Sequence, residues 1–310
     1  NKRINSDPKS WRFLSWLSEA LGEGKYKMSE KNQPNSRNIP LPIQREVRQR
    51  CGFGCVICGL PLCEYEHMLG WANVERHVAD EITLLCDRHH REKTSGLLPT
   101  EDVIEANKDP YNLREGVSKP YDLHYSGDIC EAIIGSNSFT MEDHGDGTAI
   151  IPVSIDDTPL LAFIMSDGHL LLNLLVFDEF NNLILRIVNN HLFYSVSPWD
   201  IQLVGRNLII REAQRKILID LVFDVPNKIT INRGRFLRNG VEILIRPDHA
   251  LITNNSALFS GNRMMNCQGG IVIGPHSQKY GAAVRIGNVS RYVGDRSESV
   301  KWAKEALGSS

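Results

Sequence analysis

The sequence predicts an α+β protein with a small cysteine- and histidine-rich module followed by a mostly-β C-terminal domain. Residues 51–93 contain five of the seven cysteines and four of the ten histidines. From about residue 128 onward, short apolar runs alternate with Asn, Gly and Asp at spacings of about ten to twelve residues, as in antiparallel strands joined by turns. A chain of 310 residues has room for two or three domains and at least one sizeable core.

The composition is that of an ordinary globular protein, with 42% hydrophobic and 23% charged residues. A formal net charge of -2 means that any nucleic-acid surface must be local, because the whole molecule is not a polycation. No uninterrupted apolar run reaches the length of a membrane span. We therefore expect a cytoplasmic protein without a membrane partner.

Residues 1–38 are expected to form an N-terminal helix and a linker. Large apolar residues between Trp11 and Leu21 recur at helical spacing. Residues 29–42 are rich in Asn, Ser, Pro and Lys, a composition typical of a linker.

The cysteine-rich module should occupy residues 39–125, including a connector. Its apolar pattern and its Gly and Pro breaks predict short helices and strands. They are a helix over 42–50, strands over 63–68 and 82–85, a charged helix over 87–93 and a helix over 100–107.

Two half-sites in this module have the spacing of metal ligands. Cys55 and Cys58 are separated by two residues, and Cys86 is followed three residues later by His89. Two such pairs can supply four tetrahedral ligands to one zinc ion. Cysteines also serve as buried apolar residues or as disulfides, but a disulfide framework needs an oxidising compartment. We interpret the other two cysteines of this module, Cys51 and Cys63, as packing residues, with the replacement of an assigned metal ligand by one of them as the alternative.

The segment from about Ile39 to Pro99 resembles an HNH endonuclease, a ββα-metal nuclease. In that family, a CxxC pair precedes an acidic-His dipeptide on the first strand, and the helix after the second strand opens with a CxxC-His or CxxH-His cluster. The matching residues are Glu66-His67, the second strand Ile82-Thr83-Leu84-Leu85-Cys86, and His89-His90.

The resemblance implies two separate metals. A structural zinc would be held by Cys55, Cys58, Cys86 and His89. His67 would be the general base that deprotonates water, while Glu66 and His90 would hold a catalytic divalent cation at the scissile phosphate. Carboxylate and imidazole donors suit Mg²⁺, Mn²⁺, Ni²⁺ or Zn²⁺, so they do not select one metal.

The chain departs from the family at Glu81, where the family has an Asn that orients the base. A glutamate can accept a hydrogen bond from an imidazole, so Glu81 could still orient His67. Glu81 would also add negative charge near the phosphate. The expected catalytic residues are therefore His67, Glu81 and His90. We interpret His77 as a solvated loop residue, with a contact to the site or an extra metal ligand as alternatives.

DNA is the expected partner, bound mainly through its phosphates and with little sequence specificity. Charges on helices usually face solvent, so the basic side chains here are only candidates for these contacts. They are Arg45, Arg48, Arg50, Arg88, Arg91 and Lys93.

Residues 126–310 should form a β-rich domain that ends in a helix over 297–307. Its apolar runs favour a sandwich or barrel, with a short β-solenoid as the alternative. Asn239-Gly240 between two alternating runs predicts a hairpin. We find no catalytic constellation in this domain, so binding of a small molecule or a protein, or homo-oligomerisation, would fit it.

Together these observations lead us to expect a metal-dependent HNH endonuclease that cleaves DNA and is recruited or regulated by the β-rich domain. One alternative is a non-catalytic zinc-binding nucleic-acid adaptor, in which Glu81 has ended the chemistry. The other is a nuclease held inactive until the β domain binds a signal.

Overall fold

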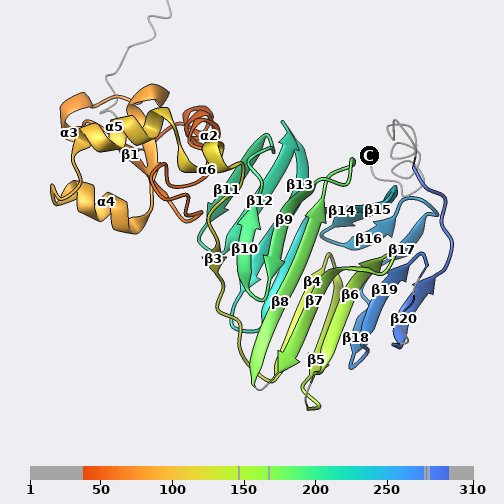
Figure 1. The fold of residues 1–310 in the computed structure, drawn as a ribbon. Helices are drawn as coiled ribbons and strands as arrows, with labels where there is room; N and C mark the ends of the chain where they lie inside the picture. The colour runs from red at the N-terminus through yellow and green to blue at the C-terminus, as the bar shows by residue number, and fades with distance from the viewer. Residues whose placement is uncertain (1–37, 146, 167, 276, 278–279, 293–310) are drawn as a thin grey trace, which may run out of the picture. The chain divides into compact units, whose positions relative to one another are not determined.

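A computed structural model describes residues 38–145, 147–166, 168–275, 277 and 280–292 (Figure 1). The described residues from Ile39 onward belong to one compact unit. The helices expected over 11–21 and 297–307 lie outside the described residues. The described part is a mixed α/β structure made mostly of strands, as the sequence predicts.

The cysteine-rich segment folds into short helices around a two-stranded antiparallel sheet. In that sheet Glu66 faces Thr83 and His67 faces Ile82. The expected elements are present, but the first strand is shorter than predicted. The bounds are α2 (Leu41–Arg50), β1 (Glu64–His67), α3 (Trp71–Val74), η1 (Ala79–Glu81), β2 (Ile82–Leu85), α4 (Asp87–Thr94), α5 (Thr100–Lys108) and α6 (Tyr111–Glu115).

One small core holds these elements together. All four residues of β2 are buried, because this short strand is apolar apart from Thr83. Val47 of α2, Val56 of the following turn and Val103 of α5 pack in the same cluster as β2. The core is small, so little apolar surface is available to stabilise this segment alone.

The rest of the described chain forms two open β-sheets. The first has eight strands, and its central strands β6 to β10 form an antiparallel meander. In spatial order the strands are β20 (Ala282–Ile286), β19 (Gly269–Ile273), β6 (Ala149–Ile155), β7 (Thr158–Ser166), β8 (His169–Phe177), β9 (Leu183–Val188), β10 (His191–Tyr194) and β3 (Tyr121–Asp122).

The second sheet has ten strands. The first half of its long strand β14 also pairs in parallel with β4, which continues through β5 to β18. The strands are β11 (Asp200–Val204), β12 (Asn207–Ala213), β13 (Lys216–Asp224), β14 (Lys228–Arg238), β15 (Val241–Arg246), β16 (His249–Ile252), β17 (Ala257–Phe259), β4 (Ile129–Ile134), β5 (Asn137–Glu142) and β18 (Arg263–Met265).

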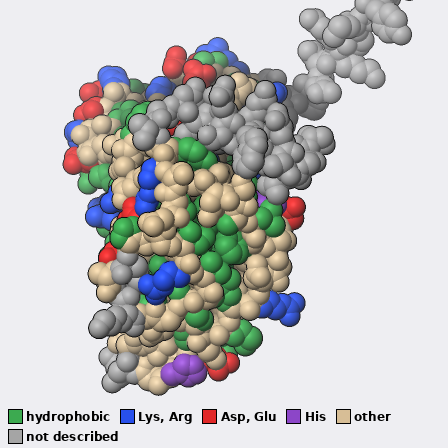
Figure 2. Space-filling view, turned by 90° about the vertical axis from the view of Figure 1, so that its right-hand side faces the viewer, with side chains coloured by type: hydrophobic (Ala, Val, Ile, Leu, Met, Phe, Trp, Pro, Cys, Tyr) green, Lys and Arg blue, Asp and Glu red, His purple; other side chains and the backbone are tan. Residues whose placement is uncertain are grey.

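The two sheets share one hydrophobic core. Phe163 and Leu174 of the first sheet and Phe236 and Ile243 of the second are buried in the same cluster. On the face that Figure 2 shows, further hydrophobic side chains form a band with few charged side chains between them. The predicted Asn239-Gly240 hairpin is confirmed: both residues have positive φ, and Arg238 pairs with Val241 across the turn.

A buried ion-pair cluster joins α2 to β11. Both oxygens of the Asp200 carboxylate accept hydrogen bonds from Arg48, at 2.9 Å each, and Arg211 adds a third at 3.2 Å. Burial opposes the charge of Arg48, but the hydrogen bonds and the charge of Asp200 outweigh it and raise the pKa of Arg48. Arg45 lies 4.5 Å from the centre of the Trp199 ring. Arg48 and Arg45 therefore have structural contacts with the segment that contains Trp199 and Asp200, and their contact with phosphates stays a prediction.

The Asp200 cluster should contribute strongly to stability. Replacing Asp200 with Ala leaves the buried Arg48 without its carboxylate, and we expect a loss of about 3–5 kcal/mol in unfolding free energy. Urea denaturation should measure this loss. Asp122→Ala removes an exposed carboxylate that pairs with His191, and this control should change stability by less than about 1 kcal/mol. A similarly small change in unfolding free energy for Asp200→Ala would contradict the stabilising role of the Asp200–Arg48 pair.

Among the described helices, none is both long enough and apolar enough to cross a lipid bilayer.

Candidate metal centre

The first half of the centre lies in the turn that follows α2. Backbone hydrogen bonds close this turn, from the Cys55 nitrogen to the Leu60 carbonyl at 2.9 Å and from the Gly59 nitrogen to the Cys55 carbonyl at 2.7 Å. The Val56 nitrogen donates to the Leu84 carbonyl at 3.1 Å and fixes the turn to β2. Gly59 has φ +78°, and a Cβ there would meet the buried Asn112 side chain at 2.4 Å. The turn therefore requires glycine at this position.

The second half lies at the start of α4. Cys86 is the residue that precedes the helix, and its carbonyl accepts the hydrogen bond of the His90 nitrogen at 2.8 Å. His89 is buried in the first turn of α4. A cysteine before a helix and a histidine three residues later lie on the same side of its first turn, so both side chains reach the Cys55 turn.

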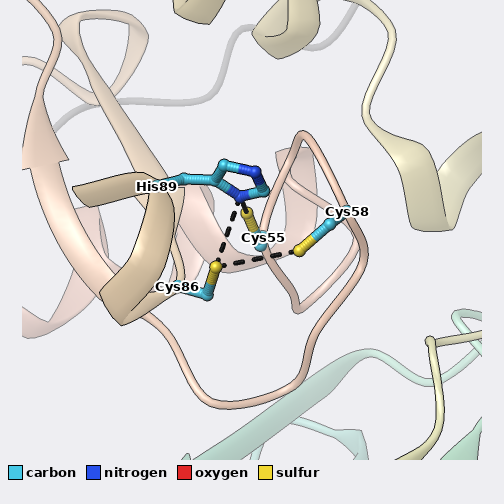
Figure 3. Close-up of side chains that lie close together, drawn as sticks. All are labelled: Cys55, Cys58, Cys86 and His89. Carbon is cyan, nitrogen blue, oxygen red and sulfur yellow. Dashed lines mark hydrogen bonds between the residues drawn. The ribbon is translucent and has the colours of Figure 1, made fainter. Parts of the chain in front are cut away.

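Cys55, Cys58, Cys86 and His89 come together as one group, with their candidate ligand atoms all within 4.8 Å of one another (Figure 3). The Sγ atoms of Cys58 and Cys86 are 3.7 Å apart, and His89 Nδ1 lies 3.3 Å from the Sγ atoms of Cys55 and of Cys86. A tetrahedral zinc site with ordinary bond lengths has S–S separations of about 3.8 Å and S–N separations of about 3.6 Å. The four residues therefore fit a metal such as zinc.

The electrostatics of the group also suit a cation. A hydrogen bond from Cys58 lowers the pKa of the Cys55 thiol to about 4. The thiolate is the form in which cysteine binds metals. His89 offers Nδ1 to the group, while its Nε2 lies 4.0 Å from a Glu92 carboxylate oxygen. A carboxylate at this position can orient a ligating imidazole.

All seven cysteines are free thiols, and three of them in this segment belong to the four-residue group. Cys51 is buried, with its sulfur 3.8 Å from Thr83 Oγ1. Cys63 donates to the Leu60 carbonyl at 2.9 Å, and burial raises the pKa of its thiol. Both lie outside the group, in agreement with their interpretation as packing residues.

A second cluster forms between β1 and α4. Glu66 Oε2 lies 3.0 Å from His90 Nε2, so the two residues expected to hold a catalytic cation are in contact. Glu64 Oε2 lies 3.5 Å from the other ring nitrogen of His90. This arrangement directs His90 Nε2 toward Glu66.

Lys93 is a member of this second cluster that the sequence did not reveal. Its Nζ lies 2.5 Å from Glu66 Oε1 and 3.5 Å from the His67 carbonyl oxygen, and its side chain is only 10% exposed. Lys93 is therefore not an exposed charge of α4, and its contact with phosphates stays a prediction. The spacing of three residues between His90 and Lys93 could have indicated that both side chains face Glu66, because residues three apart on a helix share a face.

His67, the expected general base, is buried at the end of β1. Its Nε2 lies 3.2 Å from His77 Nδ1, and the rings of both histidines contact Trp71. Burial lowers the pKa of His67, and the nearby His77 lowers it further. The interpretation of His77 as a solvated residue is wrong, because His77 packs against His67 and Trp71.

Glu81 is bound by a neighbouring arginine. Arg76 donates two hydrogen bonds to its carboxylate, the longer of them 3.0 Å, and they lower the pKa of Glu81. The charge of Glu81 acts on His67 through space, while the Glu81 backbone carbonyl accepts from the Met68 nitrogen at 2.9 Å. Hydrogen bonds of both the side chain and the backbone of Glu81 therefore fix this residue close to His67.

The remaining basic candidates differ in their exposure. Arg50 donates to the backbone carbonyls of Ala79 and Ile82, so it has a structural role. Arg88 and Arg91 have side chains that are 77% and 76% exposed, and each pairs with a carboxylate one helical turn away. Among the six basic candidates, these two remain on the surface of α4.

Comparisons with protein-family models, with curated proteins and with solved structures found no match for this chain. What the chain does must therefore be inferred from its side-chain clusters, which are the Cys₃His group, the Glu66–His90 pair and the contacts of His67 with His77 and Trp71.

Proposed function

We propose that this chain is a metal-dependent endonuclease of the HNH type that hydrolyses phosphodiester bonds of DNA, with its β-sheets recruiting or regulating the cutting module. One observation carries the proposal. Glu66 and His90, from two different elements, lie 3.0 Å apart. Glu66 directly precedes the buried His67 in β1, and His90 directly follows His89 of the Cys₃His group. This set of side chains is suited to hydrolysis of a phosphodiester by an activated water.

Glu66 Oε2 and His90 Nε2 would hold a divalent cation such as Mg²⁺, Mn²⁺, Ni²⁺ or Zn²⁺. When bound, the cation supplies positive charge at the scissile phosphate, where negative charge grows in the transition state. Glu64, at 3.5 Å from His90 Nδ1, keeps the opposite ring nitrogen turned toward Glu66. The chain thus supplies a carboxylate oxygen, an imidazole nitrogen and a carboxylate that orients the imidazole.

His67 would remove the proton from the attacking water. An ordinary imidazole exchanges protons near neutral pH, and burial together with the nearby His77 lowers the pKa of His67, which favours the neutral ring that can accept a proton. Trp71 and His77 pack on the ring and restrict its movement. The exposed side chains Arg88 and Arg91 on α4 would contact the phosphates of the DNA without reading its sequence.

A second candidate function is a zinc-binding nucleic-acid adaptor without catalytic activity. The observation that favours it is the ion pair between Lys93 and Glu66 at 2.5 Å. This pair already neutralises the carboxylate that the cation needs. Glu81 also stands where the HNH family has an Asn, and it adds a negative charge close to His67.

A plasmid-cleavage assay distinguishes the endonuclease from the adaptor. The purified protein is incubated with supercoiled plasmid and added Mg²⁺ or Mn²⁺. We expect metal-dependent cleavage by the natural protein and its loss in His90→Ala, because His90 is one of two donors to the cation. His124→Ala is the matched control, since His124 is exposed and lies on a different segment. The control should cleave like the natural protein.

Two results would reject the nuclease in favour of the adaptor. One is DNA binding by the natural protein without cleavage under either metal. The other is cleavage that is equal in His90→Ala and in the natural protein, which would identify a contaminating nuclease.

A further inference from the structure

A pocket of about 270 Å³ lies on β13, β14 and β15 of the ten-stranded sheet. It opens on the face that points away from the shared core. Ile243 and Ile245 belong to that core, whereas Leu244 between them lies in a separate small cluster and lines the pocket. Alternate residues of a strand point to opposite faces, so Leu244 forms part of the floor of an outward-facing site.

The pocket is strongly basic. Its lining contains one carboxylate, Glu242, and five cationic side chains: Arg215, Lys216, Arg233, Arg235 and Arg246. Such a concentration is unusual in a chain whose formal net charge is -2. It creates a local positive field that attracts anions.

Three of the five cations are held by neighbouring carboxylates. Arg235 is 11% exposed and binds Glu242 at 3.3 Å and also Glu212. The other two pairs are Lys216–Glu212 at 3.1 Å and Arg233–Asp220 at 2.9 Å.

The carboxylate of Glu242 is itself fixed. It is 1% exposed and accepts a hydrogen bond from Thr253 Oγ1 at 3.0 Å. Part of the wall is thus rigid before any ligand arrives, so less conformational entropy would be lost on binding.

Arg215 and Arg246 provide the unbalanced charge. Within the part of the chain that the structure describes, no ion pair joins either guanidinium to a carboxylate. Arg233 and Arg246 each adjoin a member of the last β14–β15 pair, Gly234 with Ile245, and both line the pocket. Like charges close together on a sheet are unfavourable, and an anion bound in the pocket would reduce the repulsion between these arginines.

We propose that this pocket binds a multiply charged phosphate anion of the kind found in a nucleoside diphosphate. Guanidinium groups bind phosphate oxygens through two parallel hydrogen bonds, which suits a site built mainly from arginines. The volume of about 270 Å³ suits a phosphate or diphosphate group better than a whole drug-sized ligand. The inference is independent of the nuclease proposal, because no residue of the pocket belongs to the metal centre.

Calorimetric titration of the full chain with inorganic pyrophosphate tests the site. Arg246→Ala should bind pyrophosphate at least about tenfold more weakly than the natural protein, because it loses a charged hydrogen bond to the anion. Arg215→Ala should show a similar loss. Arg206→Ala is the matched control, since Arg206 pairs with Asp224 and does not line the pocket. Its affinity should be unchanged.

Competition then distinguishes the source of the phosphate. Displacement of pyrophosphate by ADP but not by a short DNA duplex supports a free nucleotide as the ligand. Displacement by the duplex supports the same pocket as a contact for the DNA backbone. The proposal is overturned if pyrophosphate does not bind, or if Arg246→Ala and Arg215→Ala bind it as tightly as the natural protein does.

Discussion

Cys86→Ser is expected to abolish zinc binding by the group of Cys55, Cys58, Cys86 and His89 and to unfold the segment that contains these four residues. Serine lacks the thiolate that zinc binds, and the remaining three ligands leave one corner of the tetrahedron open. Zinc binding contributes about 10–16 kcal/mol of apparent folding free energy in small zinc domains. The core around β2 is small, so we expect it to be unable to replace that contribution.

Elemental analysis measures the loss of zinc, and circular dichroism measures the unfolding of the segment. The natural protein should contain about one tightly held zinc per chain, and Cys86→Ser should contain almost none and show less helix. Cys63→Ser is the matched control, because Cys63 lies in the same segment but outside the four-residue group. A Cys86→Ser protein that keeps its zinc would show that the group has been assigned wrongly.

The sequence was sufficient to predict the four-residue group because its spacing is local. Two residues separate Cys55 from Cys58, and a single helical turn separates Cys86 from His89. Each pair is therefore correctly oriented once its own turn forms. The Asn239-Gly240 hairpin was predictable for the same reason, since the turn depends on the φ angles of two adjacent residues.

Contacts between distant parts of the chain were not predictable in this way. Asp200 is 152 residues from Arg48, and nothing in the pattern around either residue indicates the other. As a result, Arg48 looked like an exposed helix charge suited to phosphate. The long-range order of the strands is a similar case, because β4 joins β14 in parallel although about a hundred residues separate them.

The basic pocket was hidden for a different reason. Arg215, Arg233 and Arg246 lie at a turn and on two strands, and each alone is typical of a solvated surface residue. The pairing of β14 with β15, which ends at Gly234 and Ile245, brings Arg233 and Arg246 to the same pocket. His77 is a comparable case within the metal-centre segment, since its contact with His67 depends on how the loop after β1 folds back.

His67→Ala should reduce metal-dependent plasmid cleavage by about 100- to 10,000-fold, the usual contribution of a general base. His67 is buried and directly follows Glu66 in β1, and its ring lies 3.2 Å from His77. Alanine removes the proton acceptor without touching a zinc ligand. Zinc content and DNA affinity should therefore stay unchanged, which separates a lost base from a lost fold.

His77→Ala is the informative comparison, because it removes the neighbour that holds the His67 ring at 3.2 Å but leaves the base in place. We expect a smaller loss of cleavage than for His67→Ala. The rate should be measured in single turnovers at saturating protein, so that weaker DNA binding does not mimic slower chemistry. If His77→Ala abolishes cleavage while His67→Ala retains it, the two histidines exchange roles, with His77 as the base and His67 as the residue that positions it. Equal cleavage by both variants and the natural protein would instead remove this histidine pair from the reaction.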